Sequence, residues 1–145
     1  MPNICIIGLG NPGAQYNGTR HNIGKDWVKS ISTGSNLELQ SKKIIEATIA
    51  ESPDNKILWG YPDKYVNESG RSINKIVKHK KFNLEQIIII HDDLDLPLGN
   101  LKLKIGGGHG GHNGLRSIIA HLGHSFIRLR VGIGHPGNKV DVTNW

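Results

Sequence analysis

The sequence predicts a single α/β domain, spanning residues 1–145, in which strands and helices are interleaved around one core. Apolar runs typical of buried strands alternate along the chain with segments of helical periodicity. The run Gln86–Ile90 contains four consecutive isoleucines, a composition that suits a central strand buried on both faces. At 145 residues the chain has the length of one ordinary domain and can bury a substantial core.

The chain is expected to begin with a strand, a tight loop and a helix. Asn3–Leu9 is an apolar run, and the turn-forming residues Gly10–Gly13 follow it, which predicts a buried strand that ends in a loop. The helix that comes next is expected to place Trp27, Val28 and Ile31 on one face.

A hairpin and a second helix are predicted next. Lys43–Ala50 and Ile57–Tyr61 are strand-like, and the Pro-Asp-Asn-Lys sequence at 53–56 between them is typical of a turn. Asn67 is expected to cap the second helix. The basic residues at 78–81 fall in its last turn, where the helix dipole favours cations, so we interpret them as a helix end rather than a binding site.

Two further strands in the second half alternate apolar and basic residues. Leu101–Ile105 and Phe126–Ile133 both show this period of two, which places the cations of each strand on one face. Those cations are Lys102, Lys104, Arg128 and Arg130. Their pairing predicts an organised basic surface.

The segment 106–114 contains six glycines, two histidines and one asparagine. A helical pattern follows it, so Asn113 is predicted to be the N-cap of that helix. A Gly-rich turn that opens a helix can bind an anion through its N–H groups; the alternative is a flexible turn. The segment lacks the Gly-Lys-Ser/Thr ending of a phosphate-binding P-loop, which disfavours a nucleotide-binding enzyme.

The positive charge of the chain is concentrated toward its C-terminus. The net charge is +6, and residues 96–145 contain six Lys/Arg against one Asp, a balance of +5. Such a concentration indicates a face that binds a polyanion, most often a nucleic acid; the alternative is a solvated basic surface. The single cysteine, Cys5, and the absence of a signal-peptide pattern favour a cytoplasmic protein without a membrane segment.

Several polar residues at predicted loop and strand ends could carry chemistry. A histidine backed by an aspartate forms a general base, and no serine or cysteine lies in a nucleophile motif, so the base would activate water. Asparagines can donate hydrogen bonds to a carbonyl oxygen that gains charge. The candidates are Asn11, His21, Asn67, Asp92, His112 and Asn113. A metal site built from His109, His112 and Asp92 lacks the usual ligand spacing, and we expect neither a metal nor a cofactor.

Together these motifs resemble bacterial-type peptidyl-tRNA hydrolase. The matching segments occur in the order and at close to the spacing of that family, and several are long and unusual. They are Gly8–Gly13, Tyr16, Thr19–Gly24, Asn67–Gly70, His91–Pro97, Gly106–Leu115 and Arg128–Gly137. The resemblance implies a three-layer α/β/α fold with a mixed sheet, and a metal-free esterase. Such enzymes cleave the ester between a peptide and the terminal ribose of tRNA.

The resemblance also implies a role for each matching residue of the catalytic pocket. His21 would activate water, oriented by Asp92, while Asn113 would position the water or the carbonyl. Asn11 and Asn67 would hold the peptide and the 3′ end of the tRNA.

Further residues are expected, on the same resemblance, to bind substrate around that pocket. Tyr16, Val66 and His112 would line it. Lys104, Arg130 and Lys139 would clamp the 5′ phosphate of the tRNA, and two of these three had already been selected by the strand pattern. Loss of His21 should nearly abolish turnover and leave tRNA binding intact.

The chain departs from the family pattern in two places that concern function. Val66 stands where the family usually has methionine, which would reshape the wall of the peptide pocket. The sequence stops at Trp145, where relatives continue into C-terminal helices, so weaker substrate binding and lower stability are expected. A second hypothesis is a relative that binds RNA without turnover. We expect a monomer that acts on peptidyl-tRNA and not at a membrane.

Overall fold

The computed structural model describes residues 2–13, 15 and 19–134. Its helices are α1 (Ile23–Gly34), α2 (Ser69–Lys80) and α3 (Asn113–Leu122). Its strands are β1 (Ile4–Gly8), β2 (Gln40–Lys42), β3 (Ala47–Glu51), β4 (Ile57–Pro62), β5 (Ile87–Asp93), β6 (Leu101–Ile105) and β7 (Ile127–Gly132).

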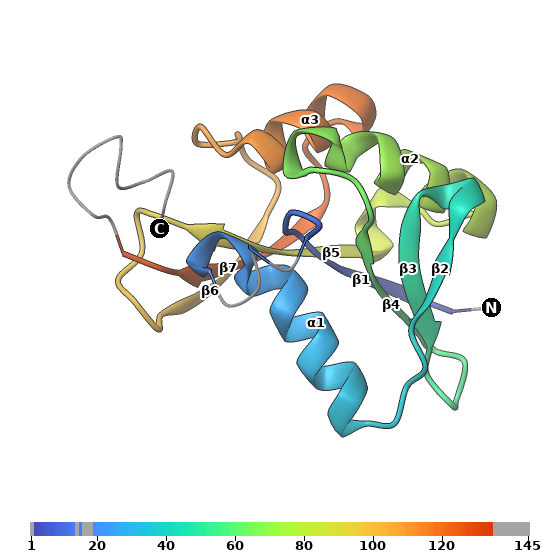
Figure 1. Ribbon diagram of the computed structural model, residues 1–145. Coiled ribbons are helices and arrows are strands. Elements are labelled where there is room, and N and C mark those ends of the chain that lie inside the picture. Colours follow the sequence, from blue (N-terminus) through green and yellow to red (C-terminus); the bar gives the residue numbers. More distant parts are fainter. Residues whose placement is uncertain (1, 14, 16–18, 135–145) are drawn as a thin grey trace.

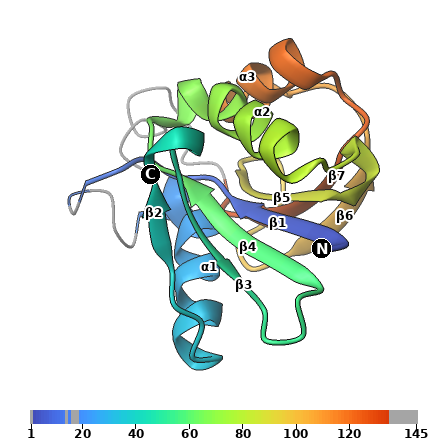
Figure 2. The same cartoon turned by 90° about the vertical axis from the view of Figure 1, so that its right-hand side faces the viewer.

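These strands form one mixed sheet in the order β2-β3-β4-β1-β5-β7-β6. Helices α2 and α3 cover one face of the sheet and α1 covers the other (Figures 1 and 2). The predicted three-layer α/β/α architecture is therefore confirmed. In the described ranges, no helix combines the length and apolar character that crossing a membrane requires.

The centre of the sheet is parallel, because β1 pairs in parallel with both β4 and β5, and β5 pairs in parallel with β7. As predicted, the isoleucine run lies in the middle and is packed on both faces. Ile87 and Ile89 belong to the core beneath α2 and α3, whereas Ile90 packs with Val28 of α1. The predicted hairpin is also present as the antiparallel pair β3–β4.

Two local predictions in the first half of the chain were wrong. The strand predicted over Lys43–Ala50 is interrupted by a 3₁₀ turn at Lys43–Ile45, after which Glu46 adopts a left-handed φ of 53°. Asn67 does not cap α2, because it lies inside a second 3₁₀ turn, Val66–Glu68, that precedes the helix. This turn moves Asn67 away from the helix end, and its side chain is exposed.

Strand β6 forms over the predicted residues, but neither of its faces is buried. It lies at the edge of the sheet and pairs only with β7 among the described strands. Leu101, Leu103 and Ile105 are 54%, 67% and 80% exposed. Apolar and basic residues do alternate along β6. In the described part of the chain, however, the helices do not extend over this edge, so the alternation does not produce a buried face.

Candidate active site

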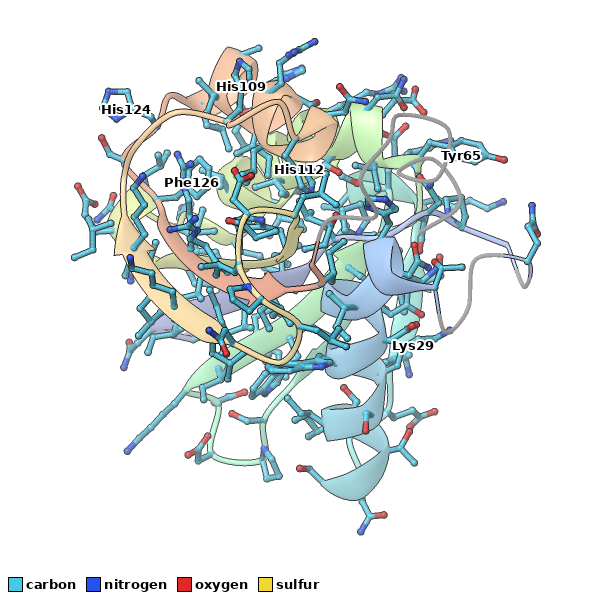
Figure 3. The ribbon with its side chains drawn as sticks, turned by 90° about the vertical axis from the view of Figure 1, so that its left-hand side faces the viewer. Lys29, Tyr65, His109, His112, His124 and Phe126 are labelled. Atoms are coloured by element: carbon cyan, nitrogen blue, oxygen red, sulfur yellow. The ribbon has the colours of Figure 1, made fainter. Side chains whose placement is uncertain are left out.

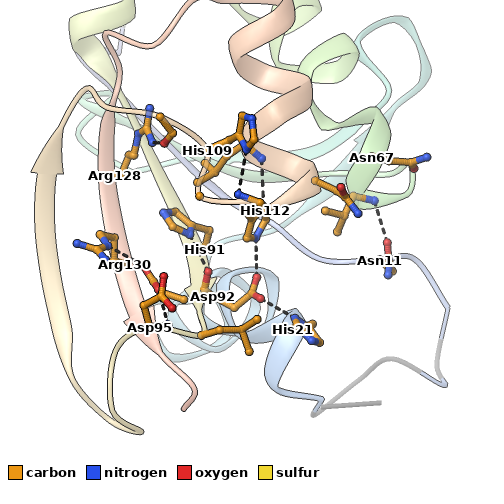
Figure 4. Close-up of a pocket in the computed structure, with 18 of the residues that line it drawn as sticks. Asn11, His21, Asn67, His91, Asp92, Asp95, His109, His112, Arg128 and Arg130 are labelled. Atoms are coloured by element: carbon orange, nitrogen blue, oxygen red, sulfur yellow. Dashed lines mark hydrogen bonds and ion pairs between the residues drawn. The ribbon is translucent and has the colours of Figure 1, made fainter. Parts of the chain in front are cut away.

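A cleft of about 1160 Å³ opens where β1 and β5 end. The carboxyl ends of neighbouring parallel strands are where open α/β sheets bind ligands. The loop after β1, the end of β5, the turn before α2 and the glycine-rich segment before α3 all contribute to it (Figure 4). It brings together the predicted residues Asn11, His21, Val66, Asn67, Asp92, Lys104, His112, Asn113 and Arg130.

Asp92 holds two histidines, one on each carboxylate oxygen. Its Oδ2 lies 2.6 Å from Nδ1 of His21, and its Oδ1 lies 2.7 Å from Nε2 of His112. His21 comes from the 3₁₀ turn that precedes α1, and His112 directly precedes α3. Asp92 is only 5% exposed, so this pairing takes place away from bulk water, where a hydrogen bond to a charge is strongest.

The hydrogen-bond partners distinguish the two histidines chemically. Nδ1 of His112 accepts the N–H of Leu115 at 3.2 Å, so its proton is on Nε2 and is donated to Asp92. Nδ1–H of His21 donates to Asp92, which places the basic lone pair of His21 on Nε2. Of the two rings, His21 is the one whose tautomer suits a general base.

His112 is also the N-cap of α3, and the prediction of Asn113 for that position was wrong. His112 has extended backbone angles, and its ring nitrogen receives the N–H three residues on, as an asparagine oxygen would. Asn113 is the first residue of the helix, and its exposed side chain lines the cleft. Because His112 caps the helix, the side-chain amide of Asn113 is not needed for capping and can form hydrogen bonds in the cleft.

The environment of Asp92 keeps its carboxylate charged. Burial by itself would raise the pKa of Asp92, but the hydrogen bonds and charge interactions of His112 and His21 act in the opposite direction. Together they hold the pKa well below its usual range. The site therefore presents a carboxylate, with its two oxygens occupied, at every pH near neutrality.

His91 is a third histidine of the cleft wall, and the sequence analysis gave it no role. It is 3% exposed, its Nδ1–H donates to the carbonyl of Asp92 at 2.8 Å, and its ring meets that of His112 edge-on at 5.2 Å. Burial is the main reason that its pKa is lowered to about 4, and His112 adds to the effect. His91 is thus a neutral packing partner of His112 at physiological pH.

Stability is expected to fall below pH 6.5 because of His91. Between about pH 4 and 6.5 the unfolded chain protonates this residue while the folded chain does not, so unfolding takes up a proton. The free energy of unfolding should therefore decrease as pH falls through this window, by up to roughly 3 kcal/mol. Urea unfolding at pH 7 and pH 4.5 should show His91→Phe losing less stability than the parent. An equal loss in both proteins would contradict this assignment.

The amide of Asn11 is oriented by the turn before α2. Its Oδ1 accepts the N–H of Val66 at 2.8 Å, so its Nδ2 carries the two hydrogens that a ligand could meet. Val66 therefore contributes a backbone donor to the site as well as an apolar wall. Asn67, the next residue, places an exposed amide at the same cleft.

The basic residues of the cleft do not form the uniform surface that the strand pattern predicted. Arg130 pairs with Asp93, Nε to Oδ2, at 2.6 Å. Lys104 extends along the glycine-rich segment: a Cβ added to Gly107 would lie 2.9 Å from its Nζ. Both residues line the cleft, and Figure 4 shows Arg130 to one side of the histidine–aspartate group.

Arg128 is not part of a basic surface, because it is only 2% exposed. Its guanidinium donates to the carbonyls of Gly107, Gly108 and His124, and it stacks on the ring of Phe126 at 4.5 Å. These bonds anchor the glycine-rich segment to β7. A period of two cannot distinguish an arginine that faces solvent from one that binds carbonyls of a neighbouring loop.

Two of the predicted residues fall outside the part of the chain that the structure describes, and two buried polar residues beside the cleft were not selected by the sequence analysis. Tyr16 and Lys139 lie outside the described residues. Asn22 and Lys25, at the start of α1, are buried and bind the backbone of Asn11. The sequence signal for these two is their closeness to His21. Asn22 follows it directly and Lys25 lies one helical turn further on, so both are near the loop that contains Asn11.

Within the described residues, no group of three or more His, Cys, Asp or Glu side chains is arranged to hold a metal ion. The histidines of the alternative metal site are occupied otherwise. His109 accepts the N–H of Gly111 through Nδ1 at 2.9 Å, and His112 is bound to Asp92 and Leu115.

Comparison with known proteins points to one family. The model of the family described as peptidyl-tRNA hydrolase matches residues 5–145. The chain is 46% identical over 140 residues to a peptidyl-tRNA hydrolase of Aliarcobacter butzleri, covering 97% of this chain and 75% of that protein. It is 44% identical to that of Francisella tularensis, covering 100% and 78%. A crystal structure of peptidyl-tRNA hydrolase from Acinetobacter baumannii superposes with a TM-score of 0.91 at 41% identity, covering 99% and 75%.

Proposed function

This chain belongs to the peptidyl-tRNA hydrolase family, and on that premise we propose how its cleft hydrolyses the ester between a peptide and the 3′-terminal ribose of tRNA. The observation that carries the proposal is the hydrogen bond between His21 and Asp92. It gives one histidine of the cleft a fixed tautomer with its basic nitrogen opposite the carboxylate, which is the arrangement a water-activating base needs.

In the proposed reaction, Nε2 of His21 takes a proton from water as the water oxygen attacks the ester carbonyl. The charged Asp92 stabilises the imidazolium that results. The tetrahedral intermediate then breaks its bond to the ribose oxygen, and that oxygen receives the proton from His21. The products are a free peptide acid and a tRNA with a free 3′ hydroxyl, so atoms and protons balance without any further reactant.

Three asparagine amides are proposed to bind and polarise the substrate. Asn113, released from capping, would position the water or donate to the carbonyl oxygen as it gains charge. Asn11 presents N–H groups because Val66 occupies its oxygen, so it would bind a carbonyl of the peptide. Asn67 would hold the 3′ end of the tRNA from the neighbouring turn.

Release of tRNA from an N-acylated aminoacyl-tRNA tests the function directly. We expect hydrolysis that disappears in His21→Ala and persists after treatment with a chelator, since the proposed water activation requires no metal. Binding of the substrate without release of tRNA would instead support the second hypothesis, a protein that binds RNA without turnover. Size-exclusion chromatography in the same buffer tests the expected monomer.

Lys104 and Arg130 are proposed to bind the 5′ phosphate region of the tRNA acceptor end. Their positions suit this role, because both line the same cleft as the histidine–aspartate group. The two cations are not equivalent. Arg130 is already paired with Asp93, whereas the ammonium of Lys104 lies over the glycine-rich segment.

Replacing Lys104 with alanine is expected to weaken tRNA binding. It should also make the slope of log K against log salt concentration less steep by about 0.9, the value for one phosphate contact, because each such contact releases about 0.9 counterion. Arg130→Ala should weaken binding further, since it also leaves the Asp93 carboxylate unpaired beside the phosphate. Filter binding at several salt concentrations measures both effects. Lys78→Ala on α2 is the control; unchanged slopes in both clamp variants would disprove the clamp.

A further inference from the structure

The backbone of Asn11, in the loop after β1, is hydrogen-bonded to two residues at the start of α1. The N–H of Asn11 donates to Oδ1 of Asn22 at 2.8 Å, and its carbonyl accepts from Nδ2 of Asn22 at 3.1 Å and from Nζ of Lys25 at 3.2 Å. The backbone of Asn11 thus has its donor satisfied once and its acceptor satisfied twice. A loop residue rarely receives this much support unless its position matters.

Both supporting residues are buried, which is unusual for their types. Asn22 is 1% exposed and Lys25 is 6% exposed. The loop packs closely against them: a Cβ added to Gly10 would lie 2.8 Å from Cβ of Lys25 and 2.9 Å from the side chain of Asn22. Removing water from an ammonium and an amide is costly without compensation, and here the Asn11 backbone provides that compensation.

The side chain of Asn11 is fixed from the opposite side. Its oxygen receives the N–H of Val66, so the two anchors together hold both the backbone and the amide plane. The remaining polar group of Asn11 is Nδ2, at the wall of the cleft. A hydrogen-bond donor held in this way loses little freedom when a ligand binds, which strengthens its contribution to affinity.

We propose that Asn22 and Lys25 are positioning residues that hold Asn11 so that its Nδ2 donates to a carbonyl of the peptide portion of the substrate. The nature of the ligand rests on the proposed function; the anchoring contacts do not. The two residues act on substrate binding through Asn11 and touch neither the ester nor the water.

The variants Lys25→Met and Asn22→Asp remove one donor to the Asn11 carbonyl each. Methionine has a similar length and keeps the apolar packing of the lysine stem, and aspartate keeps the acceptor for the N–H of Asn11. In hydrolysis of N-acylated aminoacyl-tRNA, each should raise KM about tenfold, the factor for losing one such hydrogen bond, with a much smaller change in kcat. Lys25→Arg, which restores a donor, should recover most of the affinity.

Lys29 provides a matched control. It lies one turn further along α1 (Figure 3), and its ammonium lies over the ring of Tyr61 at 5.9 Å, as that of Lys25 does at 4.9 Å. Its described contacts do not include Asn11. Lys29→Met should therefore leave KM unchanged. Affinity for deacylated tRNA should also be the same in all of these variants, because that ligand carries no peptide.

A double-mutant cycle separates positioning from a general loss of structure. In an Asn11→Ala background, Lys25→Met should cause no further rise in KM, whereas a merely structural role would add its cost in both backgrounds. The proposal is overturned if Lys25→Met and Asn22→Asp keep the KM of the Lys29→Met control, or if the effects add. If one of the two variants does not fold, the other completes the test. Failure of the unsubstituted protein to release tRNA would contradict the proposed function instead.

Discussion

His21→Ala is expected to lower kcat by about 10²–10⁴-fold, the usual contribution of a positioned general base. Of the two rings bound to Asp92, the variant loses the one whose tautomer places a lone pair opposite the carboxylate, because His112 uses its second nitrogen to cap α3. The side chain of His21 is 30% exposed, so little packing is lost. Single-turnover release of tRNA at saturating enzyme measures the chemical step directly.

Two companion measurements make this result specific to the base. Affinity for deacylated tRNA should be unchanged in His21→Ala, because the proposed clamp residues are elsewhere in the cleft. His112→Ala should lower the free energy of unfolding by about 1 kcal/mol through loss of the cap and should retain more activity than His21→Ala. The opposite ranking of the two variants would mean that the roles of the histidines are reversed.

The layers of the fold were predictable because they depend on periodicity. The isoleucine run predicted a central strand, and Ile87, Ile89 and Ile90 do pack against opposite helical layers. The burial of a strand depends on its position in the sheet as well, which the pattern does not contain. Leu103 alternates with lysines as a half-buried residue would, yet it is 67% exposed because β6 is at the edge.

The contacts of the site could not be predicted from the residues alone. His21 and Asp92 are 71 positions apart. Their pairing could be predicted only from the resemblance of the sequence to a known family. Nor could the sequence show that His112 would compete with Asn113 for the helix cap, since both types can accept the same N–H. Arg128 illustrates the same limit: its guanidinium binds loop carbonyls, a choice decided by tertiary packing and not by its own strand.

Asp92→Asn is expected to reduce kcat by up to about 10⁴-fold, the scale of an exchange that inverts the tautomer of a catalytic histidine. Both histidines donate an N–H to Asp92, whereas an asparagine offers one oxygen and one NH₂ group. One of the two rings must therefore turn a lone pair toward position 92. If that ring is His21, its proton moves to Nε2 and it can no longer accept a proton from water. Single-turnover kinetics would measure the loss.

His112 cannot easily be the ring that adapts. A lone pair on its Nε2 would place its proton on Nδ1, facing the N–H of Leu115, and α3 would lose its cap at a cost of about 1 kcal/mol. The amide should therefore act on His21, so Asp92→Asn should be catalytically poor yet bind deacylated tRNA normally. Asp93→Asn, one residue along β5, is the matched control: it removes the negative charge that pairs with Arg130 and should leave kcat intact. A variant with strong activity at position 92 would show that water activation does not depend on the tautomer of His21.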